Sequence, residues 1–204
     1  MGTRIASWHR RHTGCDQECL DRDGRARYET IGDRPPVGVC GSGLIDLLAE
    51  MLKEGIMGEN GRFSEPCQRA NEFIVTQKGK RITISQKDIN ELRLAKAGSA
   101  LNQQTLMRKY GVDLEGLDRI YLAGGFGNYV NLDSAIAVGV LPDRKDKLVT
   151  IGNGALTGAR QMLLCQERRK DAEGIAPRVQ HVKLSEEENF LDRYLDELYL
   201  RRWP

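Results

Sequence analysis

Three closely spaced glycines mark the stretch of this chain whose residue types best suit binding chemistry. Gly124, Gly125 and Gly127 directly follow the apolar residues 120–123, and apolar residues at helical spacing follow over 133–140. A strand that runs into a glycine turn and then into a helix is a common way to hold a nucleotide at the carboxyl end of a sheet. Without Cβ atoms, such a turn lets a flat ligand lie against the backbone. A tight structural turn in an α/β domain explains the same pattern, so the motif alone leaves both interpretations open.

A second group of residues near the start of the chain has the types that bind metal ions. His9, His12, Cys15 and Cys19 follow one another in the pattern His-x₂-His-x₂-Cys-x₃-Cys, and all four are side-chain types that bind zinc. Structural zinc sites have longer loops between their ligand pairs. We therefore favour a frayed arm with incidental ligand types, and we assign no metal ligand.

No residue pattern in the sequence indicates a catalytic centre. A Ser–His–Asp arrangement is missing, and His181 lies on an expected strand. Asp133, Asp143 and Asp146 flank the helix that follows the glycine turn, and we interpret them as capping or solvated residues. We assign no catalytic residue.

The composition limits the classes of protein to which the chain can belong. Its 204 residues are 40% hydrophobic and 29% charged with a net charge of +2, which suits one folded domain and argues against a nucleic-acid partner. No apolar run approaches the roughly 20 residues that cross a bilayer, and we see no secretory signal at the start. The five cysteines are odd in number and scattered, which favours reduced thiols in a cytoplasmic protein.

Strands and helices are expected to alternate along most of the chain. Residues 1–27 lack periodicity and are expected to form an irregular arm, followed by a folded lobe over 28–204. Apolar periodicity and turn residues predict strands at 25–31, 72–76, 81–85, 117–123, 148–152 and 179–184. They predict helices at 44–54, 86–110, 133–140, 155–169 and 187–200. This order predicts an α/β fold in which a mixed sheet carries flanking helices and 117–123 is a central buried strand.

The middle of the chain has the clearest local signals. The strands at 72–76 and 81–85 flank Gly79-Lys80, which predicts a hairpin. Ser85 and Asp88 have the spacing of a capping box at the start of the long helix, with Asp where Glu is usual. Gly111 stands where a glycine commonly ends a helix.

Three glycine-rich motifs occur in an order and at a spacing that carry a family resemblance. They are Val37-Gly38-Val39-Cys40-Gly41-Ser42-Gly43-Leu44-Ile45-Asp46, Ala123-Gly124-Gly125-Phe126-Gly127-Asn128-Tyr129 and Ile151-Gly152-Asn153-Gly154-Ala155-Leu156-Thr157-Gly158-Ala159. With these motifs, roughly residues 28–200 resemble the C-terminal part of the reductive activators of corrinoid-dependent methyltransferases. Those proteins belong to the group of acetate and sugar kinases, Hsp70 and actin (ASKHA, ribonuclease H-like). The resemblance implies a partial second lobe of that fold.

The resemblance also implies a role for the last two motifs. The second matches the adenosine motif, whose glycine backbone faces adenine and ribose. The third matches a connecting motif, whose small residues pack closely at the hinge between two lobes. Lys96 stands in the long helix where such proteins often place a polar side chain over the nucleoside, although a solvated lysine explains it equally well. The cofactor-binding residues implied in this way are Gly124, Gly125, Phe126, Gly127, Asn128, Lys96, Gly152 and Gly154.

Two features of the family are missing from the sequence. No Asp-x-Gly-Thr phosphate motif, whose Asp holds Mg²⁺, occurs in the chain. The cysteine cluster C-x₄₋₅-C-x₂-C of the family's N-terminal [2Fe–2S] domain is also missing. We therefore expect a fragment with a partial ATP/Mg²⁺ site that does not hydrolyse ATP alone, and a [2Fe–2S] cluster only in full-length members.

The resemblance implies a function and a partner for the complete protein. The chain is expected to be the adenosine-binding half of an ATP-dependent reductive activator, whose partner is the corrinoid protein of a methyltransferase system. Two alternatives stay open: a non-enzymatic nucleotide-binding or interaction module, and an activator of the 2-hydroxyacyl-CoA dehydratase type. An exposed sheet edge predicts poor solubility or a homodimer that covers the edge.

Overall fold

The structure is a computed structural model that describes residues 6–7, 29–30, 35–65, 67–76, 80–125, 127 and 129–203. Most of the predicted arm over 1–27 lies outside these residues, including His9, His12, Cys15 and Cys19. Within the described ranges, no helix combines the length and the apolar character that a bilayer crossing needs.

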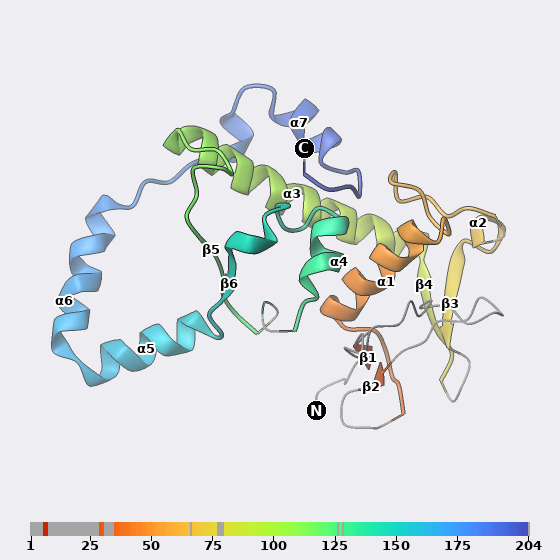
Figure 1. Ribbon diagram of the computed structural model, residues 1–204, viewed down its shortest axis with the longest axis horizontal. Coiled ribbons are helices and arrows are strands. Elements are labelled where there is room, and N and C mark those ends of the chain that lie inside the picture. Colours follow the sequence, from red (N-terminus) through yellow and green to blue (C-terminus); the bar gives the residue numbers. More distant parts are fainter. Residues whose placement is uncertain are drawn as a thin grey trace.

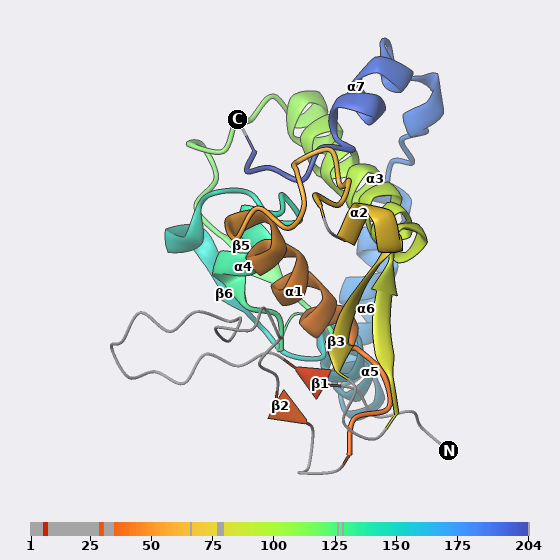
Figure 2. The ribbon, with the colours of Figure 1, turned by 90° about the vertical axis from the view of Figure 1, so that its right-hand side faces the viewer.

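One long helix, α3 (Gln86–Tyr110), organises the molecule. Helices α1 (Gly41–Lys53) and α4 (Leu132–Ala137) lie on one side of α3, and α7 (Phe190–Asp196) lies on the other (Figures 1 and 2). Helices α5 (Gly154–Leu164) and α6 (Gln166–Ile175) project from this body as an arm (Figure 1).

Helix α1 supplies one side of the core because its apolar residues recur at helical spacing. The Sγ atom of Cys40 caps the helix by accepting a hydrogen bond from the backbone N–H of Gly43 at 3.3 Å. Gly55, with φ of 67°, follows the helix end, as the predicted helix at 44–54 requires. The buried apolar face packs on α4 and consists of Ile45, Leu47, Leu48 and Met51.

The predicted hairpin is confirmed. Strands β3 (Glu72–Thr76) and β4 (Ile82–Ser85) pair antiparallel with Phe73 opposite Ile84, and the short helix α2 (Cys67–Ala70) precedes them. A register shift interrupts the ladder between Ile74 and Thr76. The side chains that face the core are Phe73, Val75, Ile82 and Ile84.

The long helix forms over the predicted residues because both of its ends are capped. The hydroxyl of Ser85 accepts a hydrogen bond from the N–H of Asp88 at 3.3 Å, and the carboxylate of Asp88 accepts one from the N–H of Ser85 at 2.8 Å. This reciprocal capping box satisfies N–H groups that lack partners inside the helix. Gly111 closes the other end in the left-handed conformation, with φ of 73°.

The α/β fold is confirmed, but the expected single mixed sheet does not form among the described residues. Strands β5 (Ile120–Leu122) and β6 (Leu148–Thr150) pair in parallel, and a 3₁₀ turn (Lys145–Lys147) leads into β6. The hairpin is a separate pair, as are β1 (Ala6–Ser7) and β2 (Glu29–Thr30). The prediction of a central buried strand at 117–123 is wrong, because β5 has one described neighbour and Tyr121 is 56% exposed.

The last third of the chain departs most from the prediction. The expected helix at 155–169 is two helices that meet at Cys165. The strand expected at 179–184 is wrong, since this segment pairs with no described strand and ends in a 3₁₀ turn (Leu184–Glu186). The terminal helix, expected at 187–200, is shortened to α7, and the chain then runs back across α3.

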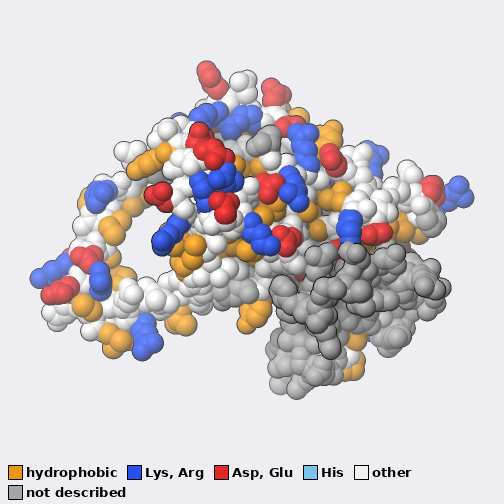
Figure 3. All heavy atoms as spheres, viewed as in Figure 1, with side chains coloured by type: hydrophobic (Ala, Val, Ile, Leu, Met, Phe, Trp, Pro, Cys, Tyr) orange, Lys and Arg blue, Asp and Glu red, His pale blue; other side chains and the backbone are white. Residues whose placement is uncertain are grey.

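The arm exposes apolar side chains to solvent. Neither α5 nor α6 has a buried residue, and Figure 3 shows hydrophobic side chains along the arm. The large apolar residues that α5 exposes are Leu156, Met162, Leu163 and Leu164. Exposed apolar surfaces are common where a protein contacts another molecule.

The capping box yields a first prediction. Ser85→Ala should lower the free energy of unfolding by about 1 kcal/mol, because it removes the hydroxyl that accepts from the Asp88 N–H. Ser99→Ala, on the exposed face of the same helix, is the matched control and should change it by less than about 0.5 kcal/mol. Urea denaturation at pH 7 measures both. Equal effects of the two substitutions would contradict a capping role.

The same cap predicts a pH dependence. The hydrogen bonds from the Ser85 hydroxyl and N–H lower the pKa of Asp88. A lowered folded pKa means that the carboxylate stabilises the fold above its unfolded value of about 3.9, and that this stabilisation is lost as the pH falls through the folded value. The deficit of Ser85→Ala should therefore shrink in acid, which urea denaturation between about pH 6 and pH 3 would detect. A deficit that stays constant over this range would contradict the assignment.

Candidate functional site

Two glycine turns lie side by side at the carboxyl ends of β5 and β6. The described residues of the first turn are 123–125, 127 and 129, and the second turn covers 151–154. Parallel pairing sets Leu122 opposite Thr150, and the ladder continues past both strands. The N–H of Ile151 donates to the carbonyl of Leu122 at 2.9 Å, and the N–H of Gly124 donates to the carbonyl of Gly152 at 2.7 Å. Two motifs that are distant in sequence are thus joined by backbone hydrogen bonds.

Three of the five described glycines in these turns are explained by the chain itself. Gly124 and Gly152 have φ of 96° and 70°, which side chains with a Cβ atom rarely adopt. A Cβ atom on Gly127 would lie 3.3 Å from the Cβ of Leu122, which is closer than such atoms usually approach, whereas one on Gly154 would lie at an ordinary contact distance of 3.4 Å from the Cβ of Ala123. Gly124 and Gly152 therefore shape the turns, and Gly127 lets the backbone approach Leu122 closely.

Gly125 has neither of these reasons to be a glycine. Its φ lies outside the left-handed region, and a Cβ atom built there would meet no atom of the described residues within 4 Å. The residue is exposed, between the buried Gly127 and the partly buried Gly124. Among the described residues, its bare backbone therefore opens onto free space, as the close approach of a flat ligand requires. The predicted site residues Phe126 and Asn128 lie outside the described residues.

Helix α5 begins directly after the second turn. The side-chain oxygen of Asn153 caps it by accepting a hydrogen bond from the N–H of Leu156 at 3.0 Å. The start of this 11-residue helix brings the positive end of its dipole to the edge of the site. The hinge packing that the third motif implies does not form among the described residues, because Gly158 meets no neighbour there and Ala159 is exposed.

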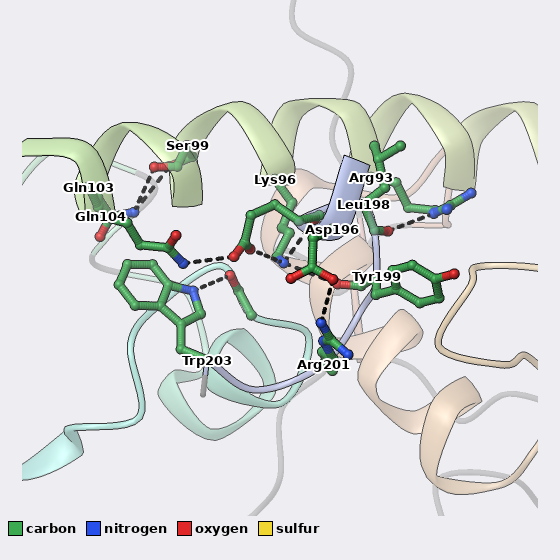
Figure 4. Close-up of polar contacts among 12 residues, drawn as sticks. Arg93, Lys96, Ser99, Gln103, Gln104, Asp196, Leu198, Tyr199, Arg201 and Trp203 are labelled. Carbon is green, nitrogen blue, oxygen red and sulfur yellow. Dashed lines mark hydrogen bonds and ion pairs between the residues drawn. The ribbon is translucent and has the colours of Figure 1, made fainter. Parts of the chain in front are cut away.

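Lys96 does not join the glycine turns. Its side chain is buried, and Nζ donates to the Glu197 carboxylate at 2.8 Å and to the backbone carbonyls of Glu197 and Tyr199 at 3.0 Å each (Figure 4). An ammonium group has three N–H donors, so all three are in use. The interpretation of Lys96 as a solvated lysine is wrong. Sequence reasoning missed Glu197, because a partner 101 residues away leaves no local pattern.

A groove of about 710 Å³ opens elsewhere, between the second half of α3 and α7. Met107, Leu114 and Trp203 are among its lining residues. Two of its charged groups are engaged within the chain, since Asp196 pairs with Arg201 and Glu197 pairs with Lys96. We assign no ligand to this groove.

The described residues bring no three potential metal ligands together. Cys67 is partly buried, and burial raises the pKa of its thiol, so the reactive thiolate is disfavoured. Asp133 pairs with Lys145 at 2.7 Å, and Asp143 pairs with Arg202 at 2.8 Å, both at the surface. These aspartates are therefore surface ion-pair partners.

A family model described as the C-terminal domain of RACo, the ASKHA domain, matches residues 15–203. The chain belongs to this family. The match includes both glycine turns, α3 and the C-terminal segment. The family resemblance drawn from the three motifs is thereby confirmed.

Two curated relatives are similar to most of the chain. The "Corrinoid activation enzyme RamQ" of Eubacterium limosum is 31% identical over 95% of this chain and 36% of its own length. The "[Co(II) methylated amine-specific corrinoid protein] reductase" of Methanosarcina barkeri is 30% identical over 79% of this chain and 29% of its own length. The chain thus spans about a third of the length of these relatives.

A solved structure supports the same fold. The "Reductive activator for corrinoid,iron-sulfur protein" superposes with a TM-score of 0.79 and is 31% identical, covering 97% of this chain and 32% of its own. The predicted actin/Hsp70-like (ASKHA) fold class is confirmed by this likeness and by the RACo C-terminal family.

The different reasons for the glycines predict different costs of substitution. Gly124→Ala should lower the free energy of unfolding by about 1–2 kcal/mol, because alanine is strained at a φ of 96°. Gly125→Ala should change it by less than about 0.5 kcal/mol, since its Cβ enters open space. Urea denaturation of both variants tests this. Equal destabilisation would show that Gly125 is required by the fold.

The buried ion pair predicts a larger loss. Lys96→Met should lower the free energy of unfolding by about 3–5 kcal/mol, because the Glu197 carboxylate would stay buried without its cation. Lys87→Met is the matched control on the same helix, since Lys87 is 84% exposed and lies 3.7 Å from Glu91. It should change stability by less than about 0.5 kcal/mol. Equal melting behaviour of the two variants would contradict the burial of Lys96.

Proposed function

We propose that the two glycine turns form the adenosine-binding part of an ATP-dependent reductive activator of corrinoid proteins. The observation that carries this proposal is Gly125, whose bare backbone faces open space at the carboxyl ends of two parallel strands. Ligands commonly bind at such strand ends in α/β folds. The names of the relatives supply the reaction and the partner.

The site suits a nucleoside in shape. An adenine ring is flat, and it can lie on the backbone at Gly125 where any Cβ atom would hold it away. The cap at Asn153 fixes the start of α5 beside the turns, so that a phosphate group extending past them would meet the positive end of a helix dipole. Gly152 and Gly154 belong to this site as the second turn, and Gly124 and Gly127 shape the first. Phe126 and Asn128 stay predicted members of the first turn.

The family resemblance implies that Lys96 contacts the nucleoside. The hydrogen-bond partners of Lys96 in the structure lead us to revise that role. With its three donors bound to Glu197 and Tyr199, it has no N–H group left for a ligand. We therefore propose a site of backbone glycines without direct contact from Lys96.

Magnesium and the iron–sulfur cluster do not fit the residues that the structure describes. Mg²⁺ with ATP takes carboxylate ligands together with phosphate oxygens, and neither an Asp-x-Gly-Thr sequence in the chain nor a ligand cluster among the described residues supplies them. A [2Fe–2S] cluster is held by four cysteines, whereas the described part of the chain contains three, Cys40, Cys67 and Cys165, which form no group. In our proposal the chain binds and orients the nucleoside, and its residues take part in no metal-dependent step.

The proposed role of the complete protein follows from energetics. Reduction of a Co(II) corrinoid needs an energy source, and ATP can supply it by shifting a conformational equilibrium. The partner we propose is the corrinoid protein of a methyltransferase system. The exposed apolar residues of α5 support contact with further polypeptide, and a homodimer and a cytoplasmic location stay predictions.

Two other functions remain in competition. A non-enzymatic nucleotide-binding or interaction module would use the same turns without a corrinoid partner. An activator of the 2-hydroxyacyl-CoA dehydratase type is less favoured, because both curated relatives carry corrinoid names. Binding to a corrinoid protein that ATP strengthens would favour the activator over the module.

Calorimetric titration of the purified chain with ATP and Mg²⁺ tests the proposal. We expect a dissociation constant of about 0.1 mM or weaker, because most phosphate contacts are missing. Adenosine should bind almost as well as ATP, for the same reason. Gly125→Val should abolish binding, because its side chain fills the space above the backbone.

Gly38→Val is the matched control for this titration. Gly38 also lacks a positive φ and meets no described atom within 4 Å, but it lies outside both turns. This variant should bind ATP as the parent chain does. A folded chain that gives no heat with ATP, or a Gly125→Val variant with the parent's affinity, would overturn the adenosine site.

A further inference from the structure

The segment 197–203, which we name the C-terminal clamp, ties the end of the chain to three other elements. Lys96 of α3 binds the backbone carbonyls of Glu197 and Tyr199. Arg93 Nε, one turn earlier in α3, donates to the carbonyl of Leu198 at 2.9 Å. On the far side, the N–H of Leu200 donates to the carbonyl of Glu59 at 2.7 Å. Figure 4 shows these side chains converging on the clamp from α3.

The clamp also reaches the end of α4. Trp203 is buried, and its Nε1–H donates to the carbonyl of Gly139 at 2.8 Å. Gly139 has φ of 78°, and a Cβ atom there would meet the carbonyl oxygen of Arg201 and would lie 2.8 Å from Cε of Lys96. Only a glycine therefore lets the end of α4, the clamp and Lys96 meet at one point.

Helix α4 connects this meeting point to the first glycine turn. It has only six residues, begins at the Asn131 cap directly after the turn, and ends just before Gly139. A helix this short moves as one body, so a shift at Gly139 is transmitted to Asn131. The β5–β6 pair is only partly buried, whereas Ala135 and Ile136 of α4 are fully buried. The packing of α4 thus anchors on the body the segment that follows the first turn.

We propose that Lys96 is a positioning residue of the nucleotide site, which acts through the C-terminal clamp and α4 on the first glycine turn. This inference rests on the proposed function of the turns. Lys96 holds the clamp, the clamp holds Gly139 through Trp203, and α4 carries this constraint to the turn that contains Gly125. Lys96 has no N–H group left for the ligand, so its effect on binding is indirect.

Coupling between the clamp and the nucleotide site must act in both directions. If the clamp favours the turn geometry that binds the nucleotide, then the nucleotide favours the closed clamp by the same factor. The clamp amides would thus be protected by a ligand they do not touch. Because a ligand that binds the folded chain also slows every amide that exchanges through global unfolding, the coupling is shown only where ATP protects the clamp amides more than the buried amides of α1.

The test is amide hydrogen exchange of the full chain with and without saturating ATP and Mg²⁺, read over residues 197–203. We expect ATP to slow exchange there by about five-fold or more, the lower end of ordinary coupling between sites. Gly125→Val should remove this slowing. Trp203→Phe, which keeps an aromatic ring but loses the N–H to Gly139, should weaken ATP binding by a similar factor and abolish the slowing.

Further variants separate the proposal from general destabilisation. Gly139→Ala should act like Trp203→Phe, because its Cβ displaces the clamp. Gly98→Ala, at an open glycine in the middle of α3, and Lys87→Met should leave both ATP affinity and exchange unchanged. Lys96→Met should show the largest loss of affinity, and if it does not fold at 25 °C the other two clamp variants decide the question.

The outcomes distinguish this inference from the proposed function. ATP binding that depends on Gly125 but leaves the clamp amides unaffected, with normal affinity in Trp203→Phe and Gly139→Ala, overturns the positioning role alone. A folded parent chain that does not bind ATP overturns both. Protection of the clamp by ATP, together with weaker binding in both clamp variants, supports the positioning role.

Discussion

The buried ion pair between Lys96 and Glu197 is the interaction on which the closure of this fold most depends. Two charges removed from water are tolerated only when further hydrogen bonds satisfy them. Here two backbone carbonyls accept the remaining N–H donors of the Lys96 ammonium group. The side-chain amide of Gln104 donates to the second carboxylate oxygen of Glu197 at 2.7 Å. Because these requirements are met in one arrangement, the pair fixes where the C-terminal clamp lies on α3. The position of Trp203 against Gly139 follows from it.

Local interactions explain which elements could be predicted from the sequence. The capping box at Ser85, the hairpin from β3 to β4 and the glycine after α3 each use partners within a few residues. Their patterns are therefore visible without knowledge of the fold. The glycine turns were found for the same reason, and their meeting through Gly124 and Gly152 follows from parallel strand pairing. The three ordered motifs were enough to identify the family.

Non-local interactions explain the errors. A strand is stabilised by its neighbours more than by its own sequence, so 179–184 could not form a strand where no described strand pairs with it. The predicted burial of 117–123 failed likewise, because β5 has a single described neighbour. Lys96 was assigned to the ligand or to solvent, since nothing near it in sequence indicates a carboxylate at Glu197. A lysine in a helix is usually solvated, and only the tertiary fold overrides that expectation.

The structure distinguishes the roles of glycines that the sequence leaves equivalent. In the sequence Gly124, Gly125 and Gly127 are equivalent members of one motif. In the structure the first is required by its φ and the third by its contact with Leu122, so neither needs a ligand to account for it. Gly125 is left without a reason inside the described chain. Stability alone does not require a glycine at this exposed position. Residues that the stability of a fold does not explain are concentrated at functional sites. The case for a nucleotide therefore rests on one residue that the fold does not need.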